Sequence, residues 1–248
     1  MEPLDSRLAA LKAKSAHTPG VSSLVLFGST TVAGASRRDR WSDIDFNLFT
    51  TDDEPGVTSR KDWDFLPAPE RIVLRAREGG DGGVVLYDDG VIFEFGAGLP
   101  WPIHDPDHEV VLDGGDISFG QPPVASDPLN QLNLFIIKLM IGYGRIMRGE
   151  VIAGNFHLRT YAVGCLCTAL RLRLFPHLSA NPFDAARRFE TGDATLASRV
   201  SVAQLLPAQD AALEFLQIAE DYLQEGWDDF PVAALQVARR WVSERAED

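Results

Sequence analysis

The sequence has few cysteines, no long apolar run and few basic residues. Its two cysteines, Cys165 and Cys167, lie one residue apart in a single apolar stretch, which does not suggest a structural disulfide. We therefore expect two reduced thiols in a cytoplasmic protein. No apolar run approaches the roughly 20 residues that a membrane-spanning helix needs. The N-terminal segment lacks the apolar core of a signal peptide. These absences predict that the chain has no membrane partner.

Acidic residues outnumber basic ones, with 36 Asp and Glu against 23 Lys and Arg in 248 residues, a formal net charge of −13. Residues 51–120 alone hold 16 acidic and 5 basic side chains. A nucleic-acid-binding protein would show a basic stripe instead, so we expect no nucleic-acid partner. Long-range repulsion argues against a polyanionic substrate and favours a cationic or neutral one. General solubility explains the same charge equally well.

The chain changes character near residue 126. Before it, short runs rich in Val, Ile and Phe alternate with Gly, Pro and Asp, which predicts strands and turns. After it, long periodic runs with few breakers predict helices. We expect an α+β fold, in which a small mixed β-sheet domain (residues 1–125) precedes a C-terminal helical bundle domain (residues 126–248). The expected strands are 22–27, 43–49, 71–76, 83–87, 91–95 and 109–112, and the expected helices are 1–16, 128–148, 155–175, 182–191, 208–224 and 231–246.

Two aspartates open the expected strand at 43–49. Side chains alternate along a strand, so Asp43 and Asp45 share one face while Ile44 and Phe46 share the other. Two carboxylates this close repel each other, and a divalent cation removes that repulsion. Mg²⁺ typically binds one or two carboxylates together with substrate phosphates and water. The pair therefore either faces solvent on an ordinary strand or holds magnesium, and we favour magnesium.

A third acid stands alone in a later apolar run, GVIFEFGAG. Glu94 lies between Phe93 and Phe95, a setting in which an acid is rarely buried without a partner. By strand alternation, the two phenylalanines point to one side and Glu94 to the other. If this strand lies beside the strand at 43–49, three carboxylates converge on one site.

A Gly-Ser turn follows the first expected strand. Gly28 and Ser29 would present backbone N–H groups and a hydroxyl at the end of the strand at 22–27. Such a turn can cradle phosphate, although a Gly-Ser pair alone most often makes an ordinary turn. The combined pattern is much more specific than any of its parts: strand, Gly-Ser, an Asp-Ile-Asp strand start, and an isolated acid in a later strand.

This combination resembles the nucleotidyltransferase superfamily, which shares the DNA polymerase beta palm. Within it, the sequence is similar to the small antibiotic nucleotidyltransferases, especially the lincosamide type and more loosely the aminoglycoside adenylyltransferases. The resemblance covers residues 20–100 and extends loosely over 127–165. The matching segments are LFGSTT at 26–31, WSDIDFNLF at 41–49, VIFEFGAG at 91–98 and GRIMRGEV at 144–151.

The resemblance implies a Mg²⁺-dependent transfer of a nucleoside monophosphate, AMP from ATP, to a hydroxyl group of a small molecule. An aminoglycoside or lincosamide antibiotic is one candidate acceptor. Asp43 and Asp45 would hold the Mg²⁺ ions, and Gly28 and Ser29 would contact the triphosphate. Glu94 would act as the base for the acceptor hydroxyl, as a third metal ligand, or as both.

Related enzymes build the acceptor pocket between their domains or across a dimer, so a homodimer is one expected arrangement. Two alternatives remain open. The chain could be a non-catalytic nucleotide-binding module of the antitoxin type, or it could transfer the nucleotide to a protein. The presence of all three acids and of the Gly-Ser turn argues against a decayed, non-catalytic fold.

A polar stripe crosses the first long helix expected in the second domain. Gln131, Lys138 and Arg145 recur every seven residues among Leu, Phe, Ile and Met. Lys138 would either reach the nucleoside triphosphate from a wall of the active cleft or lie in a solvent-facing stripe. We include Lys138 among the expected nucleotide-binding residues.

Several other polar and aromatic residues have simpler explanations. His157 and Tyr161, one helical turn apart, fit a packed helix interface better than an acceptor pocket. Trp41 is expected to pack in the core rather than to stack on a base. We expect the loop arginines at 37, 38 and 40 to be solvated rather than to clamp phosphate.

Overall fold

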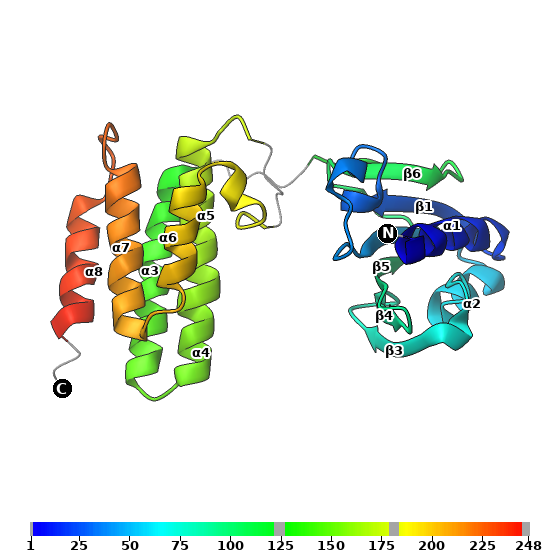
Figure 1. Ribbon diagram of the computed structural model, residues 1–248, viewed down its shortest axis with the longest axis horizontal. Coiled ribbons are helices and arrows are strands. Elements are labelled where there is room, and N and C mark those ends of the chain that lie inside the picture. Colours follow the sequence, from blue (N-terminus) through cyan, green and yellow to red (C-terminus); the bar gives the residue numbers. More distant parts are fainter. Residues whose placement is uncertain (1, 122–126, 179–183, 245–248) are drawn as a thin grey trace. The chain divides into compact units, whose positions relative to one another are not determined.

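The chain folds into two compact units, Met1–Pro122 and Pro123–Asp248, in a computed structural model that describes residues 2–121, 127–178 and 184–244 (Figure 1). We call them the sheet unit and the helical unit. The fold is of the mixed α+β class, with a six-stranded mixed sheet followed by helices.

The sheet unit is built on six strands in the order β3-β4-β5-β2-β1-β6. β2 pairs with β5 in parallel, and every other neighbouring pair is antiparallel. All six strands expected from the sequence are present, with ends that differ by one residue or, for β5, by up to three. They are β1 (Val21–Phe27), β2 (Ile44–Thr50), β3 (Ile72–Arg77), β4 (Gly83–Tyr87), β5 (Ile92–Gly98) and β6 (His108–Leu112).

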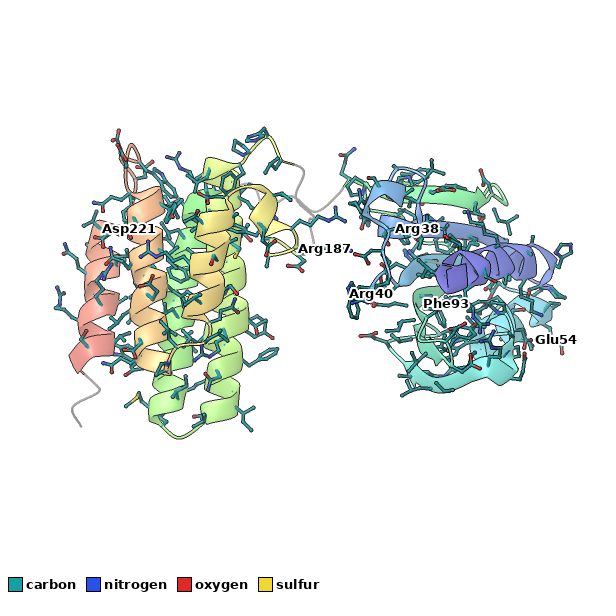
Figure 2. The ribbon with its side chains drawn as sticks, viewed as in Figure 1. Arg38, Arg40, Glu54, Phe93, Arg187 and Asp221 are labelled. Atoms are coloured by element: carbon teal, nitrogen blue, oxygen red, sulfur yellow. The ribbon has the colours of Figure 1, made fainter. Side chains whose placement is uncertain are left out.

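The two faces of the sheet differ in what covers them. On one face α1 (Glu2–His17) lies across the sheet and supplies Leu8 and Leu11 to a large apolar core (Figure 1). Phe93 extends from its strand into this core (Figure 2). Phe46 is buried in the same core. Among the described residues, the opposite face carries a smaller cluster of Val25, Phe49 and Ile103, against which Phe27, Trp101 and Ile117 pack. Much of the second face is therefore left for polar side chains.

A short helix, α2 (Glu54–Asp62), was not expected from the sequence. It is nine residues long and mostly polar, so it lacks the apolar period by which helices are recognised. Its start is fixed by Asp53, whose side chain accepts a hydrogen bond from the N–H of Gly56.

The helical unit begins with two long antiparallel helical segments. The expected helix at 128–148 is confirmed as α3 (Pro128–Met147), and Gly149, with φ of +83°, ends it. The expected helix at 155–175 is also confirmed but starts earlier. It runs without interruption through α4 (Val151–Phe156), the π-helix η4 (His157–Ala162) and α5 (Val163–Leu174).

The helix expected at 182–191 is wrong over its described part. Residues 184–188 form a bridge and turns, followed by a short 3₁₀ helix, η5 (Phe189–Thr191). The next α-helix, α6 (Ala194–Ala203), starts only after Gly192, at Asp193, whose side chain accepts hydrogen bonds from the N–H groups of Thr195 and Leu196. A capping aspartate therefore decided the boundary. The remaining two helices, α7 (Ala208–Leu223) and α8 (Val232–Glu244), were expected.

The helices of this second unit run alongside one another around one apolar core (Figure 1). Phe135, Leu139, Leu166 and Phe215 are fully buried in it. None of the helices that the structure describes combines the length and the apolar character needed to cross a bilayer.

Candidate metal-binding site

Three carboxylates converge on the thinly covered face of the sheet. β2 and β5 run parallel, with Asp45 directly opposite Glu94, and Asp43 immediately precedes β2. One carboxylate oxygen from each of the three lies within 4.8 Å of the other two. The sequence predicts this site only if the two strands are neighbours, and the structure pairs them. We call these residues the acid triad.

The apolar neighbours of the triad hold it on this face. Ile44, Phe46 and Phe93 are at most 1% exposed, and the rings of Phe46 and Phe95 stack with centroids 5.1 Å apart. Because successive strand residues point to opposite faces, burial of these side chains turns Asp45 and Glu94 outward. Burying one such ring contributes about 1.5–3 kcal/mol, so the orientation of the acids is fixed by the core.

A row of paired residues crosses the sheet at this level. Glu94 is flanked by Val84 on β4 and by Asp45 on β2, and Asp45 is flanked in turn by Phe27 on β1, which pairs with His108 on β6. Neighbouring strands lie about 4.8 Å apart, which brings facing carboxylates close enough to share one cation. The two acids thus sit in the middle of the sheet.

One side of the triad is closed by packing. A Cβ added to Gly96 would lie 2.6 Å from Asn47 Oδ1 and 2.9 Å from Trp101 Cζ2, so Asn47 and Trp101 press directly on the backbone there. A side chain at this position would displace Asn47 or Trp101. The approach to Asp45 and Glu94 is therefore from the opposite direction, where the loop that precedes Asp43 begins.

The Gly-Ser turn lies at that open end of the sheet. Phe27 pairs with Asp45, so Gly28 follows at the edge toward Asp43. Gly28 has φ of +62° and opens a short 3₁₀ turn, and its carbonyl accepts a hydrogen bond from Thr31 Oγ1 at 2.9 Å. A Cβ on Gly34 would lie 1.9 Å from that carbonyl oxygen, which shows how tightly this loop folds. The structure thus brings Gly28 and Ser29 to the same end of the sheet as the triad.

The arginines of this loop are not simply solvated, and that expectation is wrong for two of them. Arg38 donates from Nε to the Ser29 carbonyl and from Nη2 to the Thr30 carbonyl, both at 3.0 Å. Arg37 is ion-paired with Asp107. Arg38 therefore fixes the Gly-Ser turn. This positioning role could not be predicted, because its only sign in the sequence is the presence of a basic residue.

Trp41 also differs from expectation, because its side chain is 78% exposed rather than packed in the core. Its N–H donates to Asp39 Oδ1 in a tight turn, and the guanidinium of Arg40 lies 4.2 Å from the centre of its ring. The turn projects the indole away from the apolar core. An exposed aromatic ring therefore lies two residues before Asp43.

The charges around the triad favour a cation. No described Lys or Arg forms an ion pair with Asp43 or Glu94. Of the loop arginines, Arg37 and Arg38 are engaged by Asp107 and Asp5, and the guanidinium of Arg40 lies over the Trp41 ring. Three oxygen ligands in this proximity suit a hard divalent ion such as Mg²⁺.

Lys138 is not brought to the triad within either unit. It lies on α3 in the helical unit, where its Nζ is 5.4 Å from the ring centroid of Tyr161. Its contact with a nucleoside triphosphate stays a prediction.

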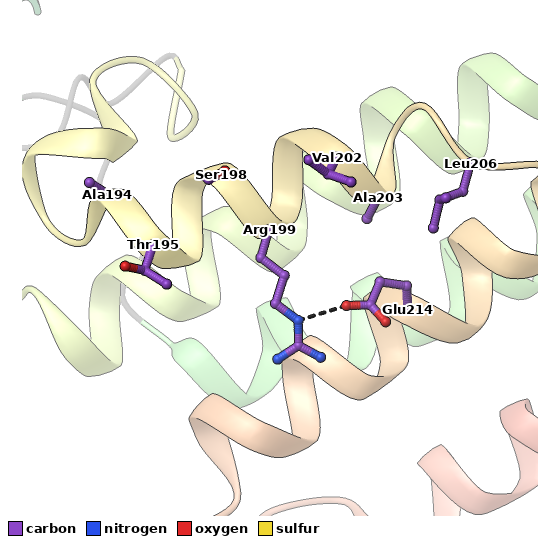
Figure 3. A pocket seen from close by; sticks show the side chains of 8 residues that line it. All are labelled: Ala194, Thr195, Ser198, Arg199, Val202, Ala203, Leu206 and Glu214. Carbon is purple, nitrogen blue, oxygen red and sulfur yellow. Dashed lines mark hydrogen bonds and ion pairs between the residues drawn. The ribbon is translucent and has the colours of Figure 1, made fainter.

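A separate hollow lies between α6 and α7 in the helical unit (Figure 3). Its walls include Val202 and Leu206, and Arg199 crosses it to bind Glu214, with Nε and Oε1 2.6 Å apart. Arg199 also pairs with Asp221 at 2.7 Å. The only charged groups lining this hollow, Arg199 and Glu214, are thus paired with each other, and the hollow lacks the reactive groups that the sheet face carries.

Comparisons with known proteins add no assignment. No protein-family model matches the chain, and no curated protein is similar enough in sequence to count as a relative.

Proposed function

We propose that the chain is a nucleotidyltransferase, which transfers a nucleoside monophosphate, AMP from ATP, to a hydroxyl group of a small molecule. The observation that supports this is the acid triad beside the Gly-Ser turn at one end of a mixed sheet. Carboxylates that hold divalent cations next to a phosphate-binding turn are what phosphoryl-group chemistry requires. On this reading, residues 1–125 are the catalytic domain and residues 126–248 the acceptor-binding domain.

Each residue of the site has one task in this proposal. Asp43 and Asp45 hold Mg²⁺, and the turn at Gly28 and Ser29 contacts the phosphates. The N–H and hydroxyl of Ser29 are its donors, because the N–H of Gly28 donates to the Asp107 carbonyl at 3.1 Å. Bound Mg²⁺ would offset the negative charge that develops on the α-phosphoryl group. Glu94, which is exposed and adjacent to Asp45, is placed to bind metal, to accept a proton, or to do both.

The proposed reaction moves one proton and exchanges one bond. The acceptor O–H gives its proton to the Glu94 carboxylate, and the acceptor oxygen forms a bond to the α-phosphorus. The bond from the α-phosphorus to the bridging oxygen breaks, and pyrophosphate leaves with that electron pair. The products are the nucleotidylated acceptor and pyrophosphate.

The charge of the sheet unit suits a neutral or cationic acceptor. Residues 1–122 carry a net charge of −10, which would repel a polyanionic acceptor. Aminoglycosides and lincosamides carry amino groups as well as hydroxyls, so they are suitable first candidates. The free thiols Cys165 and Cys167 agree with a cytoplasmic location, and an acceptor pocket shared between two copies is compatible with the proposal.

Labelled ATP, Mg²⁺ and a panel of hydroxyl-bearing antibiotics test the proposal directly. We expect label on a small molecule, and loss of that label with Asp45→Asn. Asp64→Asn, which removes an exposed acid from the same unit, is the matched control and should retain activity. Label on protein would instead indicate protein nucleotidylation. Nucleotide binding without pyrophosphate release would indicate a non-catalytic module.

A further inference from the structure

The first two helical segments of the helical unit are basic, in contrast to the rest of the chain. Residues 128–174 contain six Lys and Arg and a single acid, Glu150, whereas the whole chain has a net charge of −13. An acidic protein thus concentrates positive charge in one helical hairpin. Such a concentration predicts attraction of anions to this hairpin.

Each of the six cations has an identified contact, and for four of them it lies away from the rings of His157 and Tyr161 that Arg145 and Lys138 approach. Arg148 pairs with Glu150 at 3.2 Å, and the guanidinium of Arg173 lies 4.5 Å from the ring centre of Trp227. Arg159 and Arg171 donate to backbone carbonyls of neighbouring segments. These contacts explain why the four arginines are present without any ligand.

Lys138 and Arg145 are the remaining two. Within the described part of the chain neither forms an ion pair with a carboxylate. They are seven residues apart on α3, which places them on the same side of the helix two turns apart. Both are half-buried, so their charges are incompletely hydrated.

His157 faces these two cations from the neighbouring π-helix. Arg145 Nη1 lies 3.4 Å from His157 Nδ1. A guanidinium can only donate, so Nδ1 accepts and the imidazole is neutral. Burial lowers the pKa of His157, and the charges of Arg145 and Lys138 lower it further. We call Lys138, Arg145 and His157 the cationic row.

Two exposed aromatic rings adjoin the cationic row. Tyr161 is 46% exposed, and its ring centroid lies 5.1 Å from those of both His157 and Phe156. Phe156 is 55% exposed. The wider turn of the π-helix brings residues five apart onto one side, which allows Phe156 and Tyr161 to meet. Interruptions of this kind occur frequently at functional sites.

We propose that this face of the helical unit binds a small organic phosphate, with its oxyanion on the cationic row and its apolar or aromatic part on Phe156 and Tyr161. Arg145 and Lys138 supply charge-assisted hydrogen bonds that match phosphate. The exposed rings supply an apolar surface for the remainder of the ligand. This inference shares Lys138 with the expected nucleotide-binding residues but depends on no residue of the acid triad, so it can fail or hold independently of the proposed catalytic activity.

Binding of such an anion changes the protonation of His157. A phosphate beside the imidazole offsets the two cations and favours the charged ring, so the pKa of His157 rises when the ligand binds. Binding therefore takes up a proton at His157. The charged groups that face His157 are Arg145 and Lys138 from α3, and on its own helix Tyr161 adjoins it.

The pKa of His157 can be measured by NMR from the chemical shifts of its ring protons as pH is varied, in the full chain and without metal. The probes are inorganic phosphate, phenyl phosphate and AMP. We expect each to raise the pKa of His157 and to leave the other four histidines unchanged. We also expect phenyl phosphate to bind about tenfold more tightly than inorganic phosphate because of the two rings. If AMP binds more tightly than phenyl phosphate, the ligand is a nucleotide. If the two bind with equal affinity, the ligand is another aryl phosphate.

Two variants separate a binding role from a structural one. Arg145→Gln should weaken phenyl phosphate about tenfold and abolish the rise in the His157 pKa. Arg148→Gln, three residues further along and exposed, is the matched control and should change affinity less than twofold. Circular dichroism verifies that both variants fold. The proposal is overturned if no probe moves the His157 titration, or if Arg145→Gln responds as the wild type does.

Discussion

The two units differ in the sign of the charge that they leave without an internal partner. The sheet unit pairs Arg7, Arg38 and Arg71 with its acids but leaves no described cation against Asp43 or Glu94. The helical unit has a net charge of −3 overall, yet the hairpin of residues 128–174 has a net charge of +5. In each unit charges of one sign remain together without an ion pair among the described residues, Asp43 and Glu94 on the sheet and Lys138 and Arg145 on α3. We infer that these two groups of charges are where ligands bind, a cation on the sheet and an anion on the helices.

The largest effect is expected from removing the central acid of the sheet. Asp45→Asn should lower nucleotide transfer by about 1000-fold, equivalent to roughly 4 kcal/mol of transition-state stabilisation, because metal and phosphate lose a central ligand. Arg145→Gln, the corresponding neutralisation in the helical unit, should reduce transfer far less. Steady-state rates with a working acceptor measure both. Comparable losses in the two variants would contradict the assignment of chemistry to the sheet unit alone.

The fold of the sheet unit follows from features that are legible in the sequence. Its strands are short, apolar and separated by turn residues, so all six could be predicted. Elements that depend on single hydrogen bonds could not. α2 has almost no apolar period, and its start is set by the capping side chain of Asp53. In the same way, the capping side chain of Asp193 sets the start of α6, three residues beyond the end of the predicted helix. Apolar periodicity predicts the strands and helices that pack on the core, whereas capping residues determine where the short helices begin.

The candidate site divides in the same way. Side-chain alternation along β2 and β5 predicts the face on which Asp45 and Glu94 lie. Their convergence then requires that the two strands be neighbours in the sheet, as they are. The exposure of Trp41 and the hold of Arg38 on the Ser29 carbonyl depend on the path of one loop. Loop paths are set by local hydrogen bonds between segments, which residue patterns do not reveal.

The second prediction compares buried with exposed aromatic rings. Phe46→Ala should destabilise the sheet unit by about 3–5 kcal/mol, because the ring is buried and contacts Phe65, Phe93 and Phe95. Phe156→Ala should change stability by less than about 0.5 kcal/mol, since its ring is mostly exposed. Urea unfolding of each variant measures both values. A large loss with Phe156→Ala would mean that the aromatic pair is structural.

The third prediction concerns alkaline pH, at which the two units should lose stability in sequence. Burial raises the pKa of Cys167 to about 12 in the helical unit and that of Tyr87 to about 12 in the sheet unit. Each group stays neutral when folded but ionises when unfolded, near pH 9 and pH 10 respectively. Stability is therefore complete below these values and is lost as pH rises through them toward 12.

Hydrogen exchange distinguishes the two units in that experiment. Protection in the helical unit should begin to fall near pH 9 and protection in the sheet unit near pH 10, each by up to about 2–4 kcal/mol. Cys167→Ala should reduce the pH dependence of the helical unit alone, and the part that persists comes from Cys165 and Tyr143, whose pKa values burial also raises. Tyr87→Phe should reduce the pH dependence of the sheet unit alone. Tyr87→Phe also loses the 2.8 Å hydrogen bond to the Pro67 carbonyl, so its stability at neutral pH should fall by about 1 kcal/mol.

The smallest expected effect is the change in stability caused by Asp43→Asn, and its sign distinguishes a metal-binding role from a structural one. Without metal, the carboxylates of the acid triad repel one another, so Asp43→Asn should stabilise the sheet unit by about 0.5 kcal/mol. Added Mg²⁺ or Mn²⁺ should stabilise the wild type and leave this variant nearly unchanged, because a bound ion favours only the fold that holds it. Thermal unfolding with and without metal measures both signs. If Asp43→Asn instead destabilises the metal-free protein, the aspartate has a structural role. A carboxylate whose role is to bind a cation lowers the stability of the fold when no cation is bound.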